Sequence, residues 1–328
     1  MRRYLHMNTL DRFKIKFASI RRQLTAFCIL YSLLLVTTLT SCKTDQKRAI
    51  AEKPTVSVTI EPFRYFVEQI AGDKVNINVM VPVGNSPETY EPTPQQMIQL
   101  SHSILYFKVG QIGFEETWMK KLTENAPEME VIDTSTGITP TKTAGGFIDP
   151  HTWMSCQSAR VIADNICKAL CKWMPKDSTY FSEKCHRFKR IVIPEVEQQM
   201  TPYFLKAKEA REKLIQKKES RFPFVIYHPA LTYFAKDGGF EQLPIEEEGR
   251  EPSISQLQAL INRARRDQIK TVFIQKEFAN RNTQTFIDAT GANAIEIHPL
   301  TYQWNQEMVE IAKKIAESYG VRDKISFK

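Results

Sequence analysis

The chain has 328 residues, of which 42% are hydrophobic and 25% charged, a composition typical of folded globular proteins and not of disordered chains. Its formal charge of +8 suggests nucleic-acid binding, but seven basic residues and a single acid lie within residues 1–41. The remaining 38 basic and 36 acidic residues nearly cancel. The body of the chain therefore lacks the positive surface that DNA or RNA binding needs, and we expect no nucleic-acid partner.

The first 41 residues have the pattern of an export signal. A basic stretch precedes a largely apolar run at 24–39, which is shorter than the roughly 20 residues of a membrane span. The run ends in Leu39-Thr-Ser-Cys42, which resembles the lipobox of bacterial lipoproteins. Residues 1–41 are therefore predicted to be a lipoprotein signal peptide, with Cys42 acylated to anchor the exported protein to the cell envelope, facing the periplasm. An ordinary cleaved signal and an uncleaved anchor helix are the alternatives.

Polar, aperiodic residues at 42–53 predict a tether, and strand-like and helix-like segments alternate after it. Alternating or β-branched segments predict strands at 56–60, 75–81, 104–109, 130–133, 222–227, 271–275 and 294–297. Helical spacing predicts helices at 63–71, 92–100, 115–122, 230–234, 253–264, 282–289 and 305–318, with Thr93 and Ser253 as N-caps. Residues 158–217 are predicted to be mostly helical and to be kinked or split at Pro194 and Pro202.

This alternation predicts an α/β fold with two lobes, each a mainly parallel β-sheet flanked by helices, joined by a long helical linker. We assign residues 54–178 to an N-terminal α/β lobe, 179–218 to the linking helical segment and 219–328 to a C-terminal α/β lobe.

Four cysteines lie in the body of the chain, at Cys156, Cys167, Cys171 and Cys185. Their spacing does not match the C-x₂-C pairs of a structural zinc site. Cys167 and Cys171 are four residues apart on a predicted helix and share one of its faces. An exported protein could oxidise some of these thiols, but the sequence does not give the pairing, and buried free cysteines are equally compatible with it.

Polar side chains follow several predicted strands, at the edge where open α/β sheets bind their ligands. His228 and His298 directly follow strands, Glu88 follows the strand at 75–81, and His151 lies at the entry to the helical segment. Three imidazoles and one carboxylate can hold a tetrahedral divalent metal. Each histidine taken alone could instead cap a strand end and hydrogen-bond to the backbone.

The chain from about residue 54 onward resembles the metal-binding lipoproteins that feed zinc- and manganese-type ABC importers. The segments that carry the resemblance are 81–84 (VPVG), 87–94 (PETYEPTP), 113–118 (GFEETW), 149–153 (DPHTW), 227–234 (YHPALTYF), 251–253 (EPS), 272–274 (VFI) and 298–300 (HPL). The resemblance implies a non-enzymatic protein that captures a divalent metal between two lobes and delivers it to an ABC permease and its ATPase. We expect it to act as a monomer.

The resemblance also implies four metal ligands, two from each lobe. They would be Glu88 and His151 in the first lobe and His228 and His298 in the second, with Glu91 as the alternative to Glu88. The family usually has histidine at the first position and aspartate at the fourth, so the carboxylate has changed places here. Three histidines favour Zn²⁺ as the transported ligand, with Mn²⁺ or Fe²⁺ as alternatives. Residues 139–146 lack the histidine-rich loop of many zinc-binding members.

Two other classes of function remain open at this point. A metal-dependent hydrolase could use Glu91 or one of the acids at 246–248 as a general base, although no H-E-x-x-H motif or nucleophile elbow is present. Four protein ligands would also leave the metal no position for an activated water. An adhesin-type surface lipoprotein with a structural metal is the second alternative. If residues 246–248 have no catalytic role, they are predicted to be a solvated acidic surface.

Overall fold

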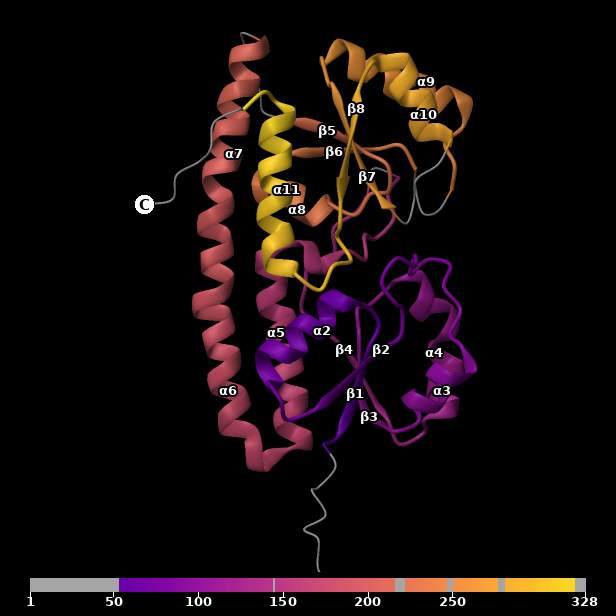
Figure 1. Ribbon diagram of the computed structural model, residues 1–328, viewed down its shortest axis with the longest axis vertical. Helices are drawn as coiled ribbons and strands as arrows, with labels where there is room; N and C mark the ends of the chain where they lie inside the picture. Colours follow the sequence, from indigo (N-terminus) through magenta and orange to yellow (C-terminus); the bar gives the residue numbers. More distant parts are fainter. Residues whose placement is uncertain (1–52, 144, 216–221, 247–249, 277–280, 322–328) are drawn as a thin grey trace, which may run out of the picture. The chain divides into compact units, whose positions relative to one another are not determined.

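The computed structural model describes residues 53–143, 145–215, 222–246, 250–276 and 281–321. Residues 53–328 form one compact unit with two four-stranded sheets (Figure 1). The predicted signal peptide, Cys42 and nearly all of the tether lie outside the described residues. In the part that is described, no helix is both long enough and apolar enough to cross a membrane.

The N-terminal sheet has the strand order β2-β1-β3-β4, and all of its neighbouring strands pair in parallel. Its strands are β1 (Thr55–Val58), β2 (Asn76–Val79), β3 (Ser103–Lys108) and β4 (Glu130–Asp133). Its helices are α2 (Glu61–Ala71), α3 (Pro94–Leu100) and α4 (Gly113–Asn125). The side chain of Thr93 accepts the Gln96 N–H in a capping box, which confirms the predicted N-cap of α3.

The helical segment runs along one side of both lobes (Figure 1). It comprises η1 (Thr152–Met154), α5 (Cys156–Trp173), η2 (Pro175–Asp177), α6 (Ser178–Arg187), the π-helical turn η3 (Phe188–Val192) and α7 (Ile193–Ile215). At Pro194 the helix is not split, because α6, η3 and α7 follow one another without a break, and the π-helical turn lies directly before this proline. Of the kink or split predicted at Pro202, the split does not occur, because α7 continues through this residue. Buried Met200 and Tyr203 on either side of this proline hold the helix against its neighbours.

The C-terminal sheet repeats the topology of the first, with strand order β6-β5-β7-β8 and parallel pairing throughout. Its strands are β5 (Pro223–Ile226), β6 (Glu241–Pro244), β7 (Thr271–Gln275) and β8 (Asn293–Ile297). Its helices are α8 (Thr232–Gly238), α9 (Ile254–Arg266), α10 (Arg281–Thr290) and α11 (Trp304–Ser318). The predicted fold class is confirmed. Strand β6 was not predicted from the sequence, because it is a short edge strand that ends in proline.

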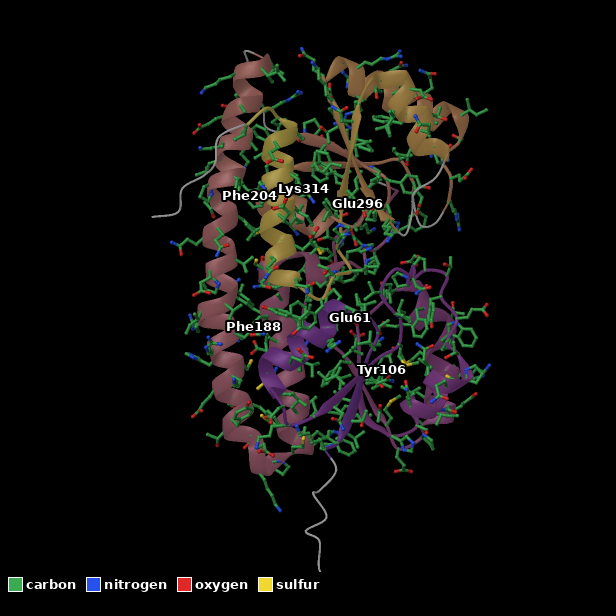
Figure 2. All side chains as sticks on the ribbon, in the orientation of Figure 1. Glu61, Tyr106, Phe188, Phe204, Glu296 and Lys314 are labelled. Carbon is green, nitrogen blue, oxygen red and sulfur yellow. The ribbon has the colours of Figure 1, made fainter. Side chains whose placement is uncertain are left out.

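Two hydrophobic cores of different size stabilise this unit. The larger one extends from the N-terminal sheet through the linking helices to α11 and one side of the C-terminal sheet. Phe188, labelled in Figure 2, belongs to it and has ring contacts with Tyr65, Phe66 and Trp304. The smaller one fills the space between the C-terminal sheet and helices α9 and α10. The outer half of the C-terminal lobe therefore has a core of its own.

Candidate metal site

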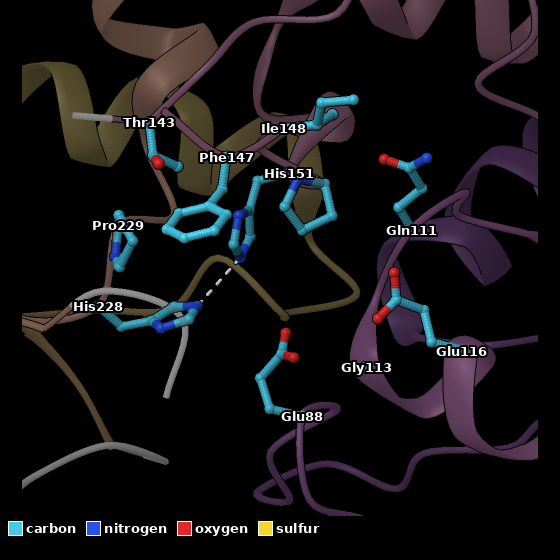
Figure 3. Close-up of a pocket in the computed structure, with 11 residues that line it drawn as sticks. Glu88, Gln111, Gly113, Glu116, Thr143, Phe147, Ile148, His151, His228 and Pro229 are labelled. Carbon is cyan, nitrogen blue, oxygen red and sulfur yellow. Dashed lines mark hydrogen bonds between the residues drawn. The ribbon is translucent and has the colours of Figure 1, made fainter. Parts of the chain in front are cut away.

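Two histidines from different lobes meet at one cavity. His151 immediately precedes η1, and His228 follows the carboxyl end of β5. Their Nε2 atoms are 3.2 Å apart, and the two residues are only 5% and 4% exposed (Figure 3). Both line a cavity of about 420 Å³. The structure thus brings together two of the four predicted ligands, which are 77 positions apart in the sequence.

A buried carboxylate fixes the Nδ1 atom of each of these rings. His151 Nδ1 is 2.7 Å from Asp149 Oδ1, and His228 Nδ1 is 3.1 Å from Glu246 Oε1. An ionised carboxylate can only accept, so an Nδ1 that bonds to it donates, and this tautomer would leave the Nε2 lone pair of each ring available to a metal. Burial acts to raise the pKa of Asp149, but its contacts with His151 hold that pKa below the ordinary value. This is the arrangement that outer carboxylates give to metal-binding histidines.

Glu88 lines the same cavity, and in Figure 3 its carboxylate points towards the two imidazoles. Its position depends on a close contact with the start of α4. A Cβ added to Gly113 would lie 2.5 Å from Glu88 Oε2, and the Phe114 N–H donates to the Pro87 carbonyl at 2.7 Å. A side chain at Gly113 would therefore push Glu88 away from its present place.

Glu115 holds the loop that leads into α4. The residue is 3% exposed, and its carboxylate accepts the N–H groups of Val109 and Gly110 at 2.7 and 2.9 Å, as well as the Thr59 hydroxyl. Burial raises the pKa of Glu115 to about 7, although these hydrogen bonds act to lower it. No role was predicted for this residue from the sequence. Its fixed position sets the path of residues 109–113, which reach the cavity.

The two other predicted ligand positions lie elsewhere. The His298 side chain is 47% exposed, with Nδ1 3.8 Å from Glu296 Oε1, and it does not line this cavity. Glu91 is exposed and is also outside the cavity. In the described segments, no group of three or more His, Cys, Asp or Glu side chains is close enough to hold a metal ion. His298 and Glu88 therefore stay predictions as ligands.

The prediction of a solvated acidic surface at 246–248 is wrong for Glu246. This residue is 4% exposed and bonds to His228, while residues 247–249 lie outside the described structure. Glu246 directly follows the carboxyl end of β6. Recognising β6 would have placed Glu246 at the ligand-binding edge by the same rule that selected His228. Gln275, at the end of β7, was also missed, and its Nε2 donates to the His228 carbonyl at 2.9 Å.

The stretch without histidines, 139–146, continues into the wall of the cavity. Lys142 and Ile148 form an isolated antiparallel bridge, and the Thr143 N–H donates to the Phe147 carbonyl at 2.8 Å. Thr143, Phe147 and Ile148 all line the cavity. In the described part of this stretch, the wall is formed by hydroxyl and hydrophobic side chains in place of metal-binding ones.

Comparison with known proteins places these features in one family. The family described as the periplasmic zinc-uptake complex component A, ZnuA, matches residues 56–318. A metal ABC transporter substrate-binding lipoprotein of Lactococcus lactis subsp. lactis is 28% identical, over 82% of this chain and 85% of its own length. The manganese ABC transporter substrate-binding lipoprotein PsaA of Streptococcus anginosus is 27% identical, over 80% of this chain and 85% of its own length.

Solved structures show the same similarity. A crystal structure of ZnuA has a TM-score of 0.72 and 31% identity, and covers 82% of this chain and all of its own. A ZnuA mutant that lacks residues 138–173 of its own sequence, solved with zinc bound, has a TM-score of 0.74 and 30% identity and covers 83% of this chain and all of its own. A manganese-bound periplasmic protein of Candidatus Liberibacter asiaticus, 22% identical, shares the fold with a TM-score of 0.69.

Proposed function

Because this chain belongs to the periplasmic zinc-uptake component A family of metal-binding proteins for ABC transport, we propose that it captures zinc between its lobes and delivers it to a permease and its ATPase. The family consists of substrate-binding proteins, so the chain is a transport protein and not an enzyme. The ion is its cargo. The lipoprotein relatives support an extracytoplasmic protein with a lipid anchor, for which Cys42 is the predicted attachment point.

The distance between the two Nε2 atoms carries the proposal. Zinc binds histidine nitrogen at about 2.0–2.1 Å, so two nitrogens on a tetrahedral ion are separated by roughly 3.3 Å. The observed separation is 3.2 Å. One histidine comes from each lobe, so an ion bound to both would join the lobes. The two carboxylates on Nδ1 keep both rings in the orientation that such an ion needs.

Glu88 and His298 are proposed as the third and fourth ligands. Glu88 is supported by its place in the cavity wall. His298 follows β8, which runs parallel to β5 and β7 in the same sheet, so it starts from the same edge as His228. Its half-exposed ring has few partners to lose, and binding would require this ring to move towards the cavity. Three nitrogens and one carboxylate oxygen favour zinc over manganese, which prefers oxygen ligands.

Competitive titration of the chelator-stripped full chain with zinc and manganese tests this function. We expect one ion per chain and tighter binding of zinc. The names of the streptococcal relatives make manganese the main competitor. Equal affinity for both ions would overturn the choice of zinc but not the metal-binding function. Failure to bind either ion at micromolar concentration would overturn both.

A further inference from the structure

Three thiols gather on the helices of the N-terminal lobe, away from the candidate metal site. Cys167 and Cys171 lie on α5, and their Sγ atoms are 3.9 Å apart. Cys185 lies on α6, and its Sγ is 3.6 Å from the carbonyl of Ala163, one turn before Cys167 on α5. Cys156 begins α5, roughly 16 Å of helix away from Cys167, and has no part in the cluster.

We propose that Cys167 and Cys185 form a disulfide that joins α5 to α6 in the exported protein, and that Cys171 remains a free thiol. The inference depends on the extracytoplasmic location, where disulfides form and persist, and not on the identity of the metal. In the described structure all four thiols are unbonded, so it represents the reduced state.

Geometry selects this pair among the three thiols. Cys167 and Cys171 are four residues apart on one helix, where Cβ atoms are about 5–6 Å apart, whereas a disulfide needs about 3.5–4.5 Å. A bridge between them would distort α5. Cys185 lies on the neighbouring helix α6, and its Sγ is 3.6 Å from the Ala163 carbonyl, so it faces α5 one turn before Cys167. A metal site is the less suitable reading, because in the described segments no three such side chains are arranged to hold an ion.

The two thiols of the pair differ in pKa. The contact with Cys167 lowers the pKa of Cys185, although burial and the charge of Asp164 act to raise it and Lys189 acts to lower it, and the same contact raises the pKa of Cys167. Lys189 lies 2.6 Å from Asp164, which is itself 3.9 Å from Cys185 Sγ. Cys185 is therefore the thiol in the cluster that most readily becomes the attacking thiolate. It is buried, whereas Cys167 and Cys171 are partly exposed.

The oxidant is an external disulfide, either on a thiol–disulfide oxidoreductase or on a small molecule. Cys167 Sγ attacks this disulfide and forms a mixed disulfide, and the displaced thiol takes the Cys167 proton. Cys185 Sγ then attacks Cys167 Sγ and expels the second thiol, which takes the Cys185 proton. Two protein thiols are oxidised and one disulfide is reduced to two thiols.

Peptide mapping after trypsin digestion can test the proposal directly, because trypsin places each of the three clustered cysteines on a separate peptide. Cys167 falls in 161–168, Cys171 in 169–172 and Cys185 in 185–187. The full chain would be produced in a bacterium that exports it, quenched with acid, alkylated, extracted in detergent and digested without reduction. Mass spectrometry should find peptides 161–168 and 185–187 linked, with Cys156 and Cys171 alkylated.

Two matched variants complete the test. Cys171→Ser should keep the link, whereas Cys185→Ser should lose it and leave Cys167 alkylated. The unmodified chain decides the matter even if a variant fails to fold. Alkylation of all four cysteines in that chain would overturn the proposal. A link between Cys167 and Cys171, or a link to another protein, would overturn it as well.

Discussion

The two lobes hold their histidines in chemically equivalent but structurally different ways. In the N-terminal lobe the supporting carboxylate, Asp149, is two residues from His151 and also accepts its backbone N–H at 2.7 Å. In the C-terminal lobe the support comes from Glu246, which follows the neighbouring strand β6, with a longer contact of 3.1 Å to His228. One arrangement is local to a short motif, whereas the other depends on how a sheet assembles.

The hydrophobic cores show the same asymmetry. The sheet of the N-terminal lobe belongs to the large core that includes the linking helices, whereas helices α9 and α10 pack on the smaller one. A separate small core can open at a lower free energy than the whole molecule. We therefore expect the part of the proposed metal site in the first lobe to be rigid. The part in the second lobe should change its position when the ion binds.

The largest expected effect comes from removing one histidine from each lobe. His151→Ala and His228→Ala should each weaken zinc binding by more than about 100-fold, since each removes a proposed direct ligand, whereas losing an outer partner costs about 10–100-fold. Calorimetric titration of chelator-stripped protein measures this loss. His102→Ala is the matched control, because His102 is exposed and outside the cavity. Unchanged affinity in both site variants would rule out the histidine pair as the binding site.

Substitution of Glu115 tests whether the stability of the first lobe depends on pH. The pKa of Glu115 is about 7 in the folded protein and 4.5 in its ordinary state, so folding favours the protonated form. Its contribution to the free energy of unfolding is complete below about pH 4.5 and is lost as the pH rises through 7. Between pH 5 and 8 the unmodified protein should lose about 2–3 kcal/mol relative to Glu115→Gln.

Urea unfolding at both pH values measures this difference. The constant penalty of replacing the carboxylate cancels, because only the change with pH is compared. Glu116→Gln provides the control, since Glu116 is the exposed neighbour on the same helix. Parallel stability curves for the unmodified protein and Glu115→Gln would show that the three hydrogen bonds keep Glu115 ionised at every pH tested.

The supporting carboxylates should give a smaller but unequal effect. Asp149→Asn and Glu246→Gln each remove an acceptor from a histidine Nδ1, for which about 10–100-fold weaker metal binding is typical. We expect Asp149→Asn to lie at the upper end, because Asp149 also fixes the backbone of His151. Glu124→Gln, at an exposed position outside the cavity, should leave the affinity unchanged. A larger loss in Glu246→Gln would contradict the view that the second lobe adjusts.

This difference between the lobes also explains which features could be predicted from the sequence alone. Local patterns in the sequence are enough to predict the order of strands and helices and both helix N-caps. They also place His151 and His228 at the ends of their elements. Strand β6 does not, because a four-residue edge strand carries little periodic signal, and Glu246 was misread as a consequence. The continuity of α7 through Pro202 was missed for a related reason: packing against α11 outweighs a local helix-breaking residue. Distances between lobes, which decide where His298 lies, depend on tertiary packing that no local pattern encodes.

The smallest expected effect comes from two equivalent caps, one in each lobe. Thr93 caps α3 and Ser253 caps α9, each in a capping box with a glutamine three residues later. Thr93→Ala and Ser253→Ala should each cost about 1 kcal/mol. If the small core opens on its own, Ser253→Ala should speed hydrogen exchange in α9 and α10 by about fivefold while β1 and β3 keep their protection. Thr93→Ala gives the matched comparison in the other lobe. Equal loss of protection across both lobes in Ser253→Ala would mean that they unfold as one cooperative unit, and the adjustable half of the site would then need another explanation.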